Sequence, residues 1–366
     1  MSAAAVRVPF NVLRPGDDRA AIDAAVARVF DSGWFVLGPE VAAFEAEFAA
    51  ATGAAHAVGV NTGTDAIALA LRALGIGPGD EVITSPLSAA YSALAIDMTG
   101  ARPVFADIDP VRLTIDPAAI AAAITARTRA IVPVHLYGQP ADLDGVAAIA
   151  ARHGLAVVED ACQAHLATVN GRPLGRGSAA AAYSFYPTKN LGALGDGGAV
   201  TTDDPALAAR VARLRNGGQS SRYHHDERGV NSRLDELQAA ILRARLPRLA
   251  AATAARRRLA ARYRERLATA PVTVPRECDP GHVYHLFPVL VDARDRFQAH
   301  LHEHGVETLV HYPVPIPRQP AAQAWSPDSC PLADEACARV VSLPLYPSLA
   351  DGAQGDVARA VLAFSR

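Results

Sequence analysis

The sequence predicts an α/β protein whose larger part is built around a mostly parallel sheet of seven strands. Short apolar runs alternate with helical patterns through the first two thirds of the chain, and strands joined by helical crossovers are typical of parallel sheets. At about 150 residues per domain, 366 residues suggest two or three domains. The predicted strands are His56–Val60, Glu81–Thr84, Arg102–Ala106, Ala130–Val134, Ala156–Glu159, Ala181–Phe185 and Gly198–Thr201.

Amphipathic helical patterns lie between several of these strands, at Asp65–Leu74, Pro117–Ile124 and Asp142–His153. The character of the chain changes near residue 231. Residues Leu234–Leu267 have helical periodicity with a kink expected at Pro247, which indicates a long helix leading out of the larger domain.

A smaller α+β domain is expected beyond this helix. Val283–Val291 reads as a strand, Arg294–Gly305 as a helix, and a further helix is expected near the C-terminus. We therefore place a large domain at residues 1–245 and a small C-terminal domain at residues 246–366.

The composition argues against several classes of function. The net charge is −2, so the chain has no electrostatic case for binding nucleic acid or an anionic membrane. The apolar stretch Val82–Ile96 contains Pro86 and is shorter than the roughly 20 residues that a membrane-spanning helix needs. Met1–Phe10 lacks the long apolar core of a signal peptide, so the expected location is cytoplasmic.

The cysteines and histidines do not indicate a disulfide framework or a metal site. The four cysteines are scattered and none has CxxC spacing, so buried thiols are expected. The histidines of 224–225 and 300–304 lack a HExxH pattern or cysteine partners, which favours solvated positions over metal binding.

One compositional feature points to chemistry. Of the 35 basic residues one is a lysine, Lys189, and the other 34 are arginines. Arginine serves surface charge and ion pairs as well as lysine does, but it stays protonated and cannot act as an amine nucleophile. A chain so biased toward arginine keeps a lysine most readily where a primary amine is required, although chance survival is the alternative.

The surroundings of Lys189 favour an imine-forming amine. The segment Tyr183–Asn190 runs from a strand into a turn and then into a glycine-rich loop, where backbone can approach a bound cofactor closely. Lysine imines hold pyridoxal 5'-phosphate, whose pyridine nitrogen needs a carboxylate partner. Asp160 is the candidate, because it ends an apolar strand at the edge where open α/β sheets bind ligands. Glu159 and Asp160 could instead open a loop or cap a helix.

A phosphate site is indicated between a strand and a helix at Asn61–Asp65. A glycine-containing turn at a helix N-terminus offers free N–H groups and a favourable dipole to an anion, although N-capping by Thr64 would explain the same residues. The nucleotide-binding signatures are not matched. Lys189 is followed by Asn190 rather than serine or threonine, and Gly75–Gly79 joins a helix to a strand, the reverse of the dinucleotide fingerprint.

These residues resemble the DegT/DnrJ/EryC1/StrS sugar aminotransferases, pyridoxal phosphate enzymes of the fold type I (aspartate aminotransferase) class. The resemblance runs from Asp31–Glu40 to Ser342–Pro344. It implies that Lys189 attaches the cofactor, that Asp160 pairs with the pyridinium nitrogen and that Gln163 lies near the phenolic oxygen. It further implies a phosphate site formed by Gly63 and Thr64 amides, Ser184 and, from a partner subunit, Asn231, and therefore a homodimer.

Within the family, the segments Val134–Gly138, Asp160–His165 and His311–Pro315 look like the branch that aminates C3 of keto-deoxysugar nucleotides. The resemblance implies glutamate as amino donor. The candidate substrate contacts are Tyr91, His165, Arg233, His311 and Tyr312.

The sequence departs from the family pattern twice. Ala89 stands where relatives carry an aromatic residue that stacks on the cofactor ring, and Tyr91 is a possible substitute. Pro317 stands where relatives often have a histidine. Aminotransferases acting on a C4 keto-sugar nucleotide or an inosose remain alternatives, as does a non-catalytic regulator that binds the cofactor. Lys189 argues against a keto-sugar dehydratase, because relatives of that kind have histidine in place of the lysine.

Overall fold

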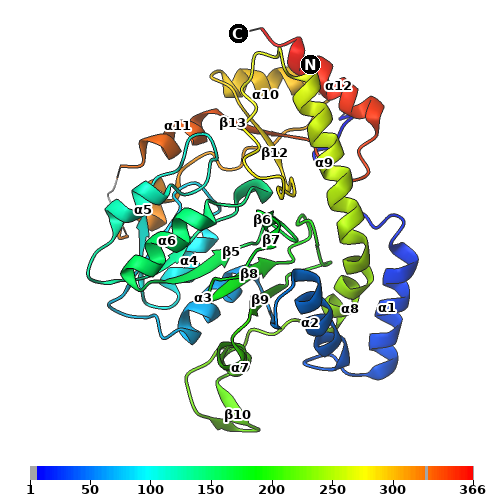
Figure 1. The fold of residues 1–366 in the computed structure, drawn as a ribbon. Helices are drawn as coiled ribbons and strands as arrows, with labels where there is room; N and C mark the ends of the chain where they lie inside the picture. Colours follow the sequence, from blue (N-terminus) through cyan, green and yellow to red (C-terminus); the bar gives the residue numbers. More distant parts are fainter. Residues whose placement is uncertain (1–5, 326–328, 366) are drawn as a thin grey trace.

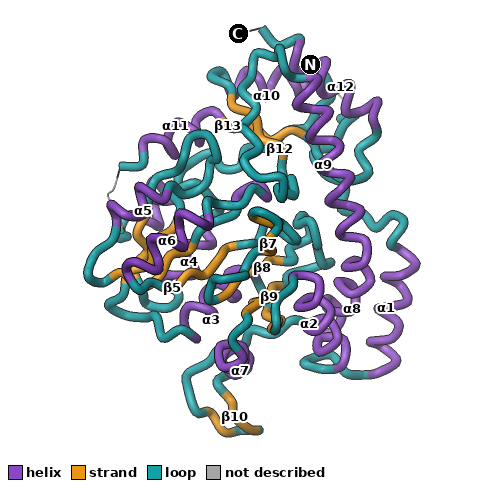
Figure 2. The backbone as a smooth tube through the Cα atoms, viewed as in Figure 1, coloured by secondary structure: helices purple, strands orange, loops and turns teal. Residues whose placement is uncertain are grey.

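In a computed structural model of the chain, which describes residues 6–325 and 329–365, a seven-stranded sheet forms the centre of the larger part (Figures 1 and 2). The first five residues of the predicted non-signal segment Met1–Phe10 lie outside the described residues. The strand order is β1-β9-β8-β5-β4-β2-β3, and only β9 runs antiparallel to its neighbours. The strands are β1 (His56–Val60), β2 (Glu81–Thr84), β3 (Arg102–Phe105), β4 (Thr128–Val132), β5 (Ala156–Asp160), β8 (Ala180–Ser184) and β9 (Gly198–Thr202).

The seven predicted strands and the α/β class are confirmed. The largest shift is in β4, which begins and ends two residues before the predicted run Ala130–Val134. Two short hairpins lie outside the main sheet and were not predicted. They are β6 (Thr168–Val169) with β7 (Arg172–Pro173) and β10 (Gln219–Ser221) with β11 (His224–His225).

Helices cover both faces of the sheet because alternate side chains of each buried strand point to opposite sides. One face packs against α3 (Gly63–Ala73), α4 (Tyr91–Asp97) and α7 (Pro205–Leu214). The other packs against α2 (Pro39–Thr52), α5 (Pro117–Ala123), α6 (Leu143–His153) and α8 (Glu236–Arg245). Helix α1 (Arg19–Ser32) packs against α8.

The long predicted helix 234–267 is present with its kink. Helix α8 ends at Arg245, Pro247 lies in the 3-10 turn η2 (Leu246–Arg248), and α9 (Leu249–Arg266) follows. Figure 1 shows α8 and α9 running along one side of the molecule to the C-terminal elements. The predicted boundary at 245/246 falls at this kink, and the division into two domains stays a prediction.

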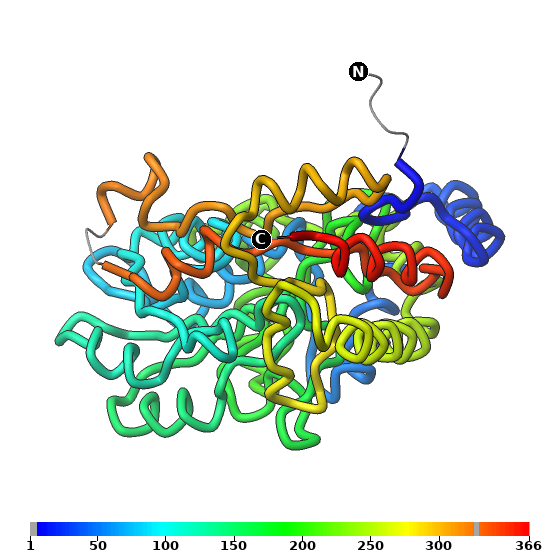
Figure 3. The backbone as a smooth tube through the Cα atoms, turned by 90° about the horizontal axis from the view of Figure 1, so that it is seen from above, coloured from blue at the N-terminus to red at the C-terminus, as the bar shows by residue number. Residues whose placement is uncertain are grey.

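The C-terminal elements form a second apolar cluster with α9, in which the N-terminal Val8 is also buried. Figure 3 shows α10 and α12 lying over this end of the molecule. The elements are β12 (Phe287–Leu290), α10 (Arg294–Glu303), the 3-10 turns η3 (Ile316–Arg318) and η4 (Pro320–Ala322), α11 (Pro331–Arg339), β13 (Val340–Leu343) and α12 (Asp351–Leu362). Within residues 6–325 and 329–365, no helix is long and apolar enough to cross a membrane.

The predicted strand Val283–Val291 is too long, since β12 begins at Phe287. The backbone N–H groups of Val283 and Leu286 instead donate to the carbonyls of Gly138 and Tyr137, at 3.0 and 3.3 Å. These residues therefore pair with the 3-10 turn η1 (Leu136–Gly138) of the larger part of the molecule, a contact that strand periodicity does not encode.

Candidate active site

The carboxyl ends of β5 and β8 bring the predicted cofactor residues to one face of the sheet. Side chains two residues apart on a strand point to the same side of the sheet. Val158 and Ala182 pack toward α3. Asp160 and Ser184, each two residues further along, therefore face the same helix. Strands β5 and β8 are parallel neighbours, with Asp160 opposite Ala182. The edge is the one at which open α/β sheets bind ligands, as predicted.

Asp160 is buried and holds two hydrogen bonds. Its Oδ2 accepts from the Ser92 hydroxyl at 2.7 Å, and its Oδ1 accepts from the Cys162 backbone N–H at 3.1 Å. An ionised carboxylate can accept about four hydrogen bonds, so Asp160 retains capacity for a further donor. A protonated pyridine nitrogen is such a donor.

Lys189 follows β8 in a turn closed by a hydrogen bond from its own N–H to the Tyr186 carbonyl, at 2.8 Å. Burial lowers the pKa of its amine, and the nearby Cys162 thiol and Asp160 carboxylate partly oppose this shift. In the part of the chain that the structure describes, the amine forms no ion pair within 4.0 Å. A lysine with a lowered pKa and an uncommitted amine is suited to nucleophilic chemistry.

The N-terminus of α3 supplies the predicted phosphate site. Residues Gly63 and Thr64 are the first two of the helix, so their N–H groups have no partners within it. A Cβ atom built on Gly63 would lie 2.6 Å from the Ser184 Cβ and 2.7 Å from the Cys162 sulfur, so glycine is required for this close approach. The residues present therefore fit pyridoxal phosphate: an amine, a carboxylate with spare capacity and an anion-binding helix end.

The alternative prediction, in which Thr64 caps the helix, named the wrong threonine. Thr62, not Thr64, is the N-cap, and its hydroxyl accepts from the Asp65 N–H at 3.0 Å. Because Thr62 satisfies the third amide of the helix, the first two amides stay available.

Gln163 is held in one orientation at the side of this site. Its Oε1 accepts from the Tyr137 N–H at 2.8 Å, and its Nε2 donates to the Tyr312 hydroxyl at 3.1 Å. The Tyr137 hydroxyl in turn donates to the His311 carbonyl. Burial raises the pKa of Tyr312 to about 12, so its hydroxyl keeps its proton at neutral pH.

The other predicted substrate contacts lie in different environments. Tyr91, at the start of α4, is 63% exposed and lies close enough to affect the pKa of Tyr312. His311 is half-buried, with its Nδ1 3.0 Å from the Ser342 hydroxyl, and burial together with Lys189 lowers its pKa to about 4. These positions are compatible with contact to a ligand.

His165 is fully buried against the rings of Tyr183 and Phe185, at centroid distances of 5.6 and 5.8 Å. Within the described ranges, neither ring nitrogen has a hydrogen-bond partner at bonding distance. Burial and Lys189 lower its pKa to about 3, an effect that the backbone of Ser184 partly opposes. The position of His165 does not support the prediction that it contacts substrate.

Asn231 and Arg233 lie in a segment beside the start of α3. Ser232 between them donates to Asp65 at 2.7 Å and accepts from the Asn61 N–H at 3.1 Å. Asn231 is exposed, whereas Arg233 is half-buried and donates to Asn216 at 3.2 Å. The role predicted for Asn231, in the site of a second subunit, stays a prediction.

Sequence reasoning missed Ser92 and Tyr137. Ser92 comes from α4, 68 residues before Asp160, and no spacing rule links the two. Tyr137 contributes its backbone N–H, which any residue could supply, so its side chain gave no signal.

The burial predicted for the cysteines and the exposure predicted for the histidines are met only in part. Cys330 and Cys337 are buried, whereas Cys162 and Cys278 are half-buried, and none of the four is in a disulfide. His224 and His225 are exposed, as predicted, and His300 is half-buried, with its Nε2 2.9 Å from the Ala360 carbonyl.

The chain is similar to known proteins over most of its length. A model of the DegT/DnrJ/EryC1/StrS aminotransferase family matches residues 17–362. The dTDP-3-amino-3,4,6-trideoxy-alpha-D-glucose transaminase of Streptomyces venezuelae is 51% identical over 352 residues, covering 94% of this chain and 92% of the relative.

Two solved structures extend the comparison. The crystal structure of S. venezuelae DesV, in complex with a ketimine intermediate, is 50% identical, with a TM-score of 0.95 and 97% of each chain covered. The structure of NtdA from Bacillus subtilis with bound cofactor PMP is 34% identical, with a TM-score of 0.92, covering 98% of this chain and 85% of that one.

Proposed function

The chain belongs to the DegT/DnrJ/EryC1/StrS aminotransferase family, and we propose that it transfers an amino group from glutamate to a keto-deoxysugar nucleotide. It is a pyridoxal phosphate-dependent aminotransferase of the type I fold. The proposed substrate is a dTDP-3-keto-6-deoxyhexose, supported by the name of the S. venezuelae transaminase. The observation that carries the catalytic proposal is the single amine of Lys189 beside the incompletely bonded Asp160.

When bound, the cofactor supplies an electron-withdrawing pyridine ring and an aldehyde carbon that accepts amines. Asp160 would hold the proton at the pyridine nitrogen, and Gln163 would orient the phenolic oxygen through its second Nε2 hydrogen. Lys189 would first hold the cofactor and then, with its lowered pKa, move the proton at the substrate carbon. The two free amides of α3 and the Ser184 hydroxyl would bind the phosphate.

The proposed substrate entrance lies near Tyr91, Tyr312 and His311. Tyr312 keeps its phenolic proton and receives one bond from Gln163, so its own hydrogen can be donated to a sugar oxygen. Tyr91 is exposed and stands near Ala89, so it is the candidate to cover the cofactor ring in place of the aromatic residue of relatives.

We also propose a homodimer. Trp34, Phe35 and Val36 are 57%, 50% and 42% exposed, and Leu194 is 43% exposed. Val36 pairs with Asp235 at the start of α8, and Leu194 donates its N–H to a side chain of the same helix, so these residues border one surface. An exposed apolar surface is typical of an interface. Val36→Asp should convert the dimer to a monomer in light scattering, whereas an unchanged mass would contradict this interface.

The substrate proposal is tested by assaying 3-keto sugar nucleotides, 4-keto sugar nucleotides and an inosose with glutamate as donor. We expect formation of 2-oxoglutarate with the 3-keto compound and none with Lys189→Arg, which keeps the charge but removes the amine. Preference for a 4-keto compound or the inosose would overturn the C3 assignment. Visible absorbance that does not respond to glutamate, despite bound cofactor, would indicate the non-catalytic regulator. The cytoplasmic location stays a prediction.

A further inference from the structure

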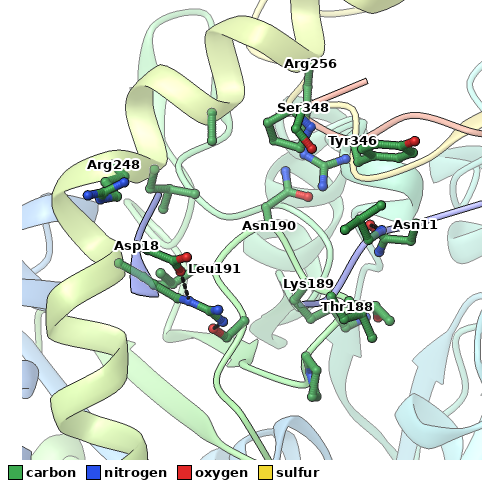
Figure 4. Close-up of a pocket in the computed structure, with 18 of the residues that line it drawn as sticks. Asn11, Asp18, Thr188, Lys189, Asn190, Leu191, Arg248, Arg256, Tyr346 and Ser348 are labelled. Atoms are coloured by element: carbon green, nitrogen blue, oxygen red, sulfur yellow. Dashed lines mark hydrogen bonds and ion pairs between the residues drawn. The ribbon is translucent and has the colours of Figure 1, made fainter. Parts of the chain in front are cut away.

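A cavity of about 290 Å³ lies between the N-terminal segment, the loop that carries Lys189 and the start of α9. Of the residues assigned above to the cofactor site, its wall includes Lys189 alone. Figure 4 shows Arg256 reaching from α9 toward Asn190, with Tyr346 and Ser348 beside the guanidinium. The cavity therefore places polar side chains around a buried cation.

Arg256 is 5% exposed and has neutral partners. Its Nη1 donates to the carbonyls of Tyr284, His285 and Leu345, at 3.2, 3.2 and 2.9 Å. Within residues 6–325 and 329–365, it forms no salt bridge, and its hydrogen bonds are made through Nη1 rather than through Nε or Nη2. Burial lowers the pKa of Arg256 to about 10, with no acidic side chain opposing the shift. A buried charge is normally paired, so this guanidinium lacks its expected counter-charge.

The other charged groups of the cavity do not supply that counter-charge. Asp18 accepts from Arg245 at 2.8 Å and is neutralised by it. Asp17 is exposed, and its backbone carbonyl, not its carboxylate, accepts from Arg248 at 3.0 Å. Arg14 at the rim is also exposed. The balance of charge in the cavity is positive, which favours an anionic occupant.

We propose that this cavity binds a small oxyanion of the carboxylate or phosphate class, with Arg256 as its buried counter-charge. Arg256 donates to the His285 carbonyl, and the Nδ1 atom of His285 lies 3.2 Å from the side-chain oxygen of Asn190. Asn190 directly follows Lys189 in the chain. A bound anion therefore stabilises the loop that carries the reactive amine. This proposal does not depend on the sugar-nucleotide substrate proposed above.

The test uses a tethered carboxylate. Ala252 lines the cavity one helical turn before Arg256, so Ala252→Glu places a carboxylate beside the guanidinium, and Ala252→Gln is the matched neutral control. The holoenzymes, matched for cofactor content, are titrated with inorganic phosphate or glutarate, with sodium chloride at equal ionic strength as reference. Thermal unfolding and calorimetry report binding.

We expect phosphate or glutarate, but not sodium chloride, to raise the Tm of the wild type and Ala252→Gln. Ala252→Glu should have a higher Tm without added anion and at least about tenfold weaker anion affinity. A response to phosphate alone assigns the phosphate class, and a response to glutarate alone assigns the carboxylate class. Absence of binding to the wild type, or equal binding to Ala252→Glu, would overturn the proposal.

Discussion

The two faces of the sheet at the end of β5 hold adjacent carboxylates with different numbers of partners. Glu159 is fully buried and accepts from the His135 ring at 3.0 Å, the Gly175 N–H at 3.0 Å and the Ser178 hydroxyl at 2.5 Å. The His135 Nδ1 accepts from the Ala141 N–H at 3.0 Å, so its Nε2 must carry the hydrogen donated to Glu159. This face is a closed network that joins two loops to the sheet.

On the opposite face, which we call the open face, the carboxylate has fewer hydrogen-bond partners. Asp160 accepts from Ser92 and from the Cys162 N–H and retains capacity for another donor, with Lys189 nearby. Strand alternation alone puts these neighbouring residues in different surroundings. The comparison teaches that Glu159, which has three partners, joins loops to the sheet, whereas Asp160, which has two partners and lies near the reactive amine, is the candidate place of a ligand.

The substitution Asp160→Asn is the strongest test of the difference between the two faces. The amide cannot hold a proton at the pyridine nitrogen by charge, so we expect the single-turnover rate with glutamate to fall about 10³-fold. The rate is measured from the visible absorbance of the cofactor. Glu159→Gln is the matched control on the closed face, and its rate should stay within about tenfold of wild type. Equal losses in the two variants would contradict the division into open and closed faces.

The closed face is tested by His135→Ala. The change leaves the buried Glu159 without its ring partner, so the free energy of unfolding should fall by about 3–5 kcal/mol. Chemical denaturation measures this loss. His224→Ala, at an exposed position of β11, should leave the stability within about 0.5 kcal/mol of wild type. A loss no larger than that of His224→Ala would show that the network is not structural.

A pH experiment on His165 sharpens the comparison, because this ring is buried among apolar rings of the closed face and its nitrogens have no hydrogen-bond partner at bonding distance in the described part of the chain. Its folded pKa of about 3 lies below the ordinary histidine value of 6.5, so the unfolded state binds more protons between these values. Stability therefore rises with pH across this window and is lost as the pH falls from 6.5 toward 3.

Between about pH 7 and about pH 4.5, this residue should account for a loss of about 3 kcal/mol that His165→Leu does not suffer. Denaturation midpoints at the two pH values measure the difference. His224→Leu is the control and should lose as much stability as the wild type. An acid sensitivity of His165→Leu equal to that of the wild type would place the titrating group elsewhere.

The smallest expected effect concerns the close packing at the start of α3, on the open face. Gly63→Ala forces a Cβ to within 2.6 Å of Ser184, so the start of α3 must shift, at a cost of about 1–3 kcal/mol. Cofactor affinity should weaken with it, as measured by fluorescence titration. Gly352→Ala, in α12 with nothing within 4 Å, should be neutral or stabilising by up to about 1 kcal/mol. Wild-type cofactor affinity in Gly63→Ala would argue against the phosphate site.

Much of the fold and part of the site were predictable from the chain. The sheet strands are short runs whose composition reports their own burial, and Pro247 reports the kink between α8 and α9. Lys189 stood out by composition, and Asp160 by its place at a strand end. Such signals are local, so each can be recognised from the residue and its neighbours in the chain.

What the sequence by itself determined is therefore the set of elements and the identity of the reactive groups. The tertiary structure alone decided which partners those groups have: Ser92 for Asp160, neutral carbonyls for Arg256 and, among residues 6–325 and 329–365, no hydrogen-bond partner at bonding distance for the ring nitrogens of His165. Its contacts also shortened β12 by pairing Val283 with Gly138. The physical reason is that hydrogen bonds and desolvation depend on distant segments meeting in space, which periodicity and composition do not record.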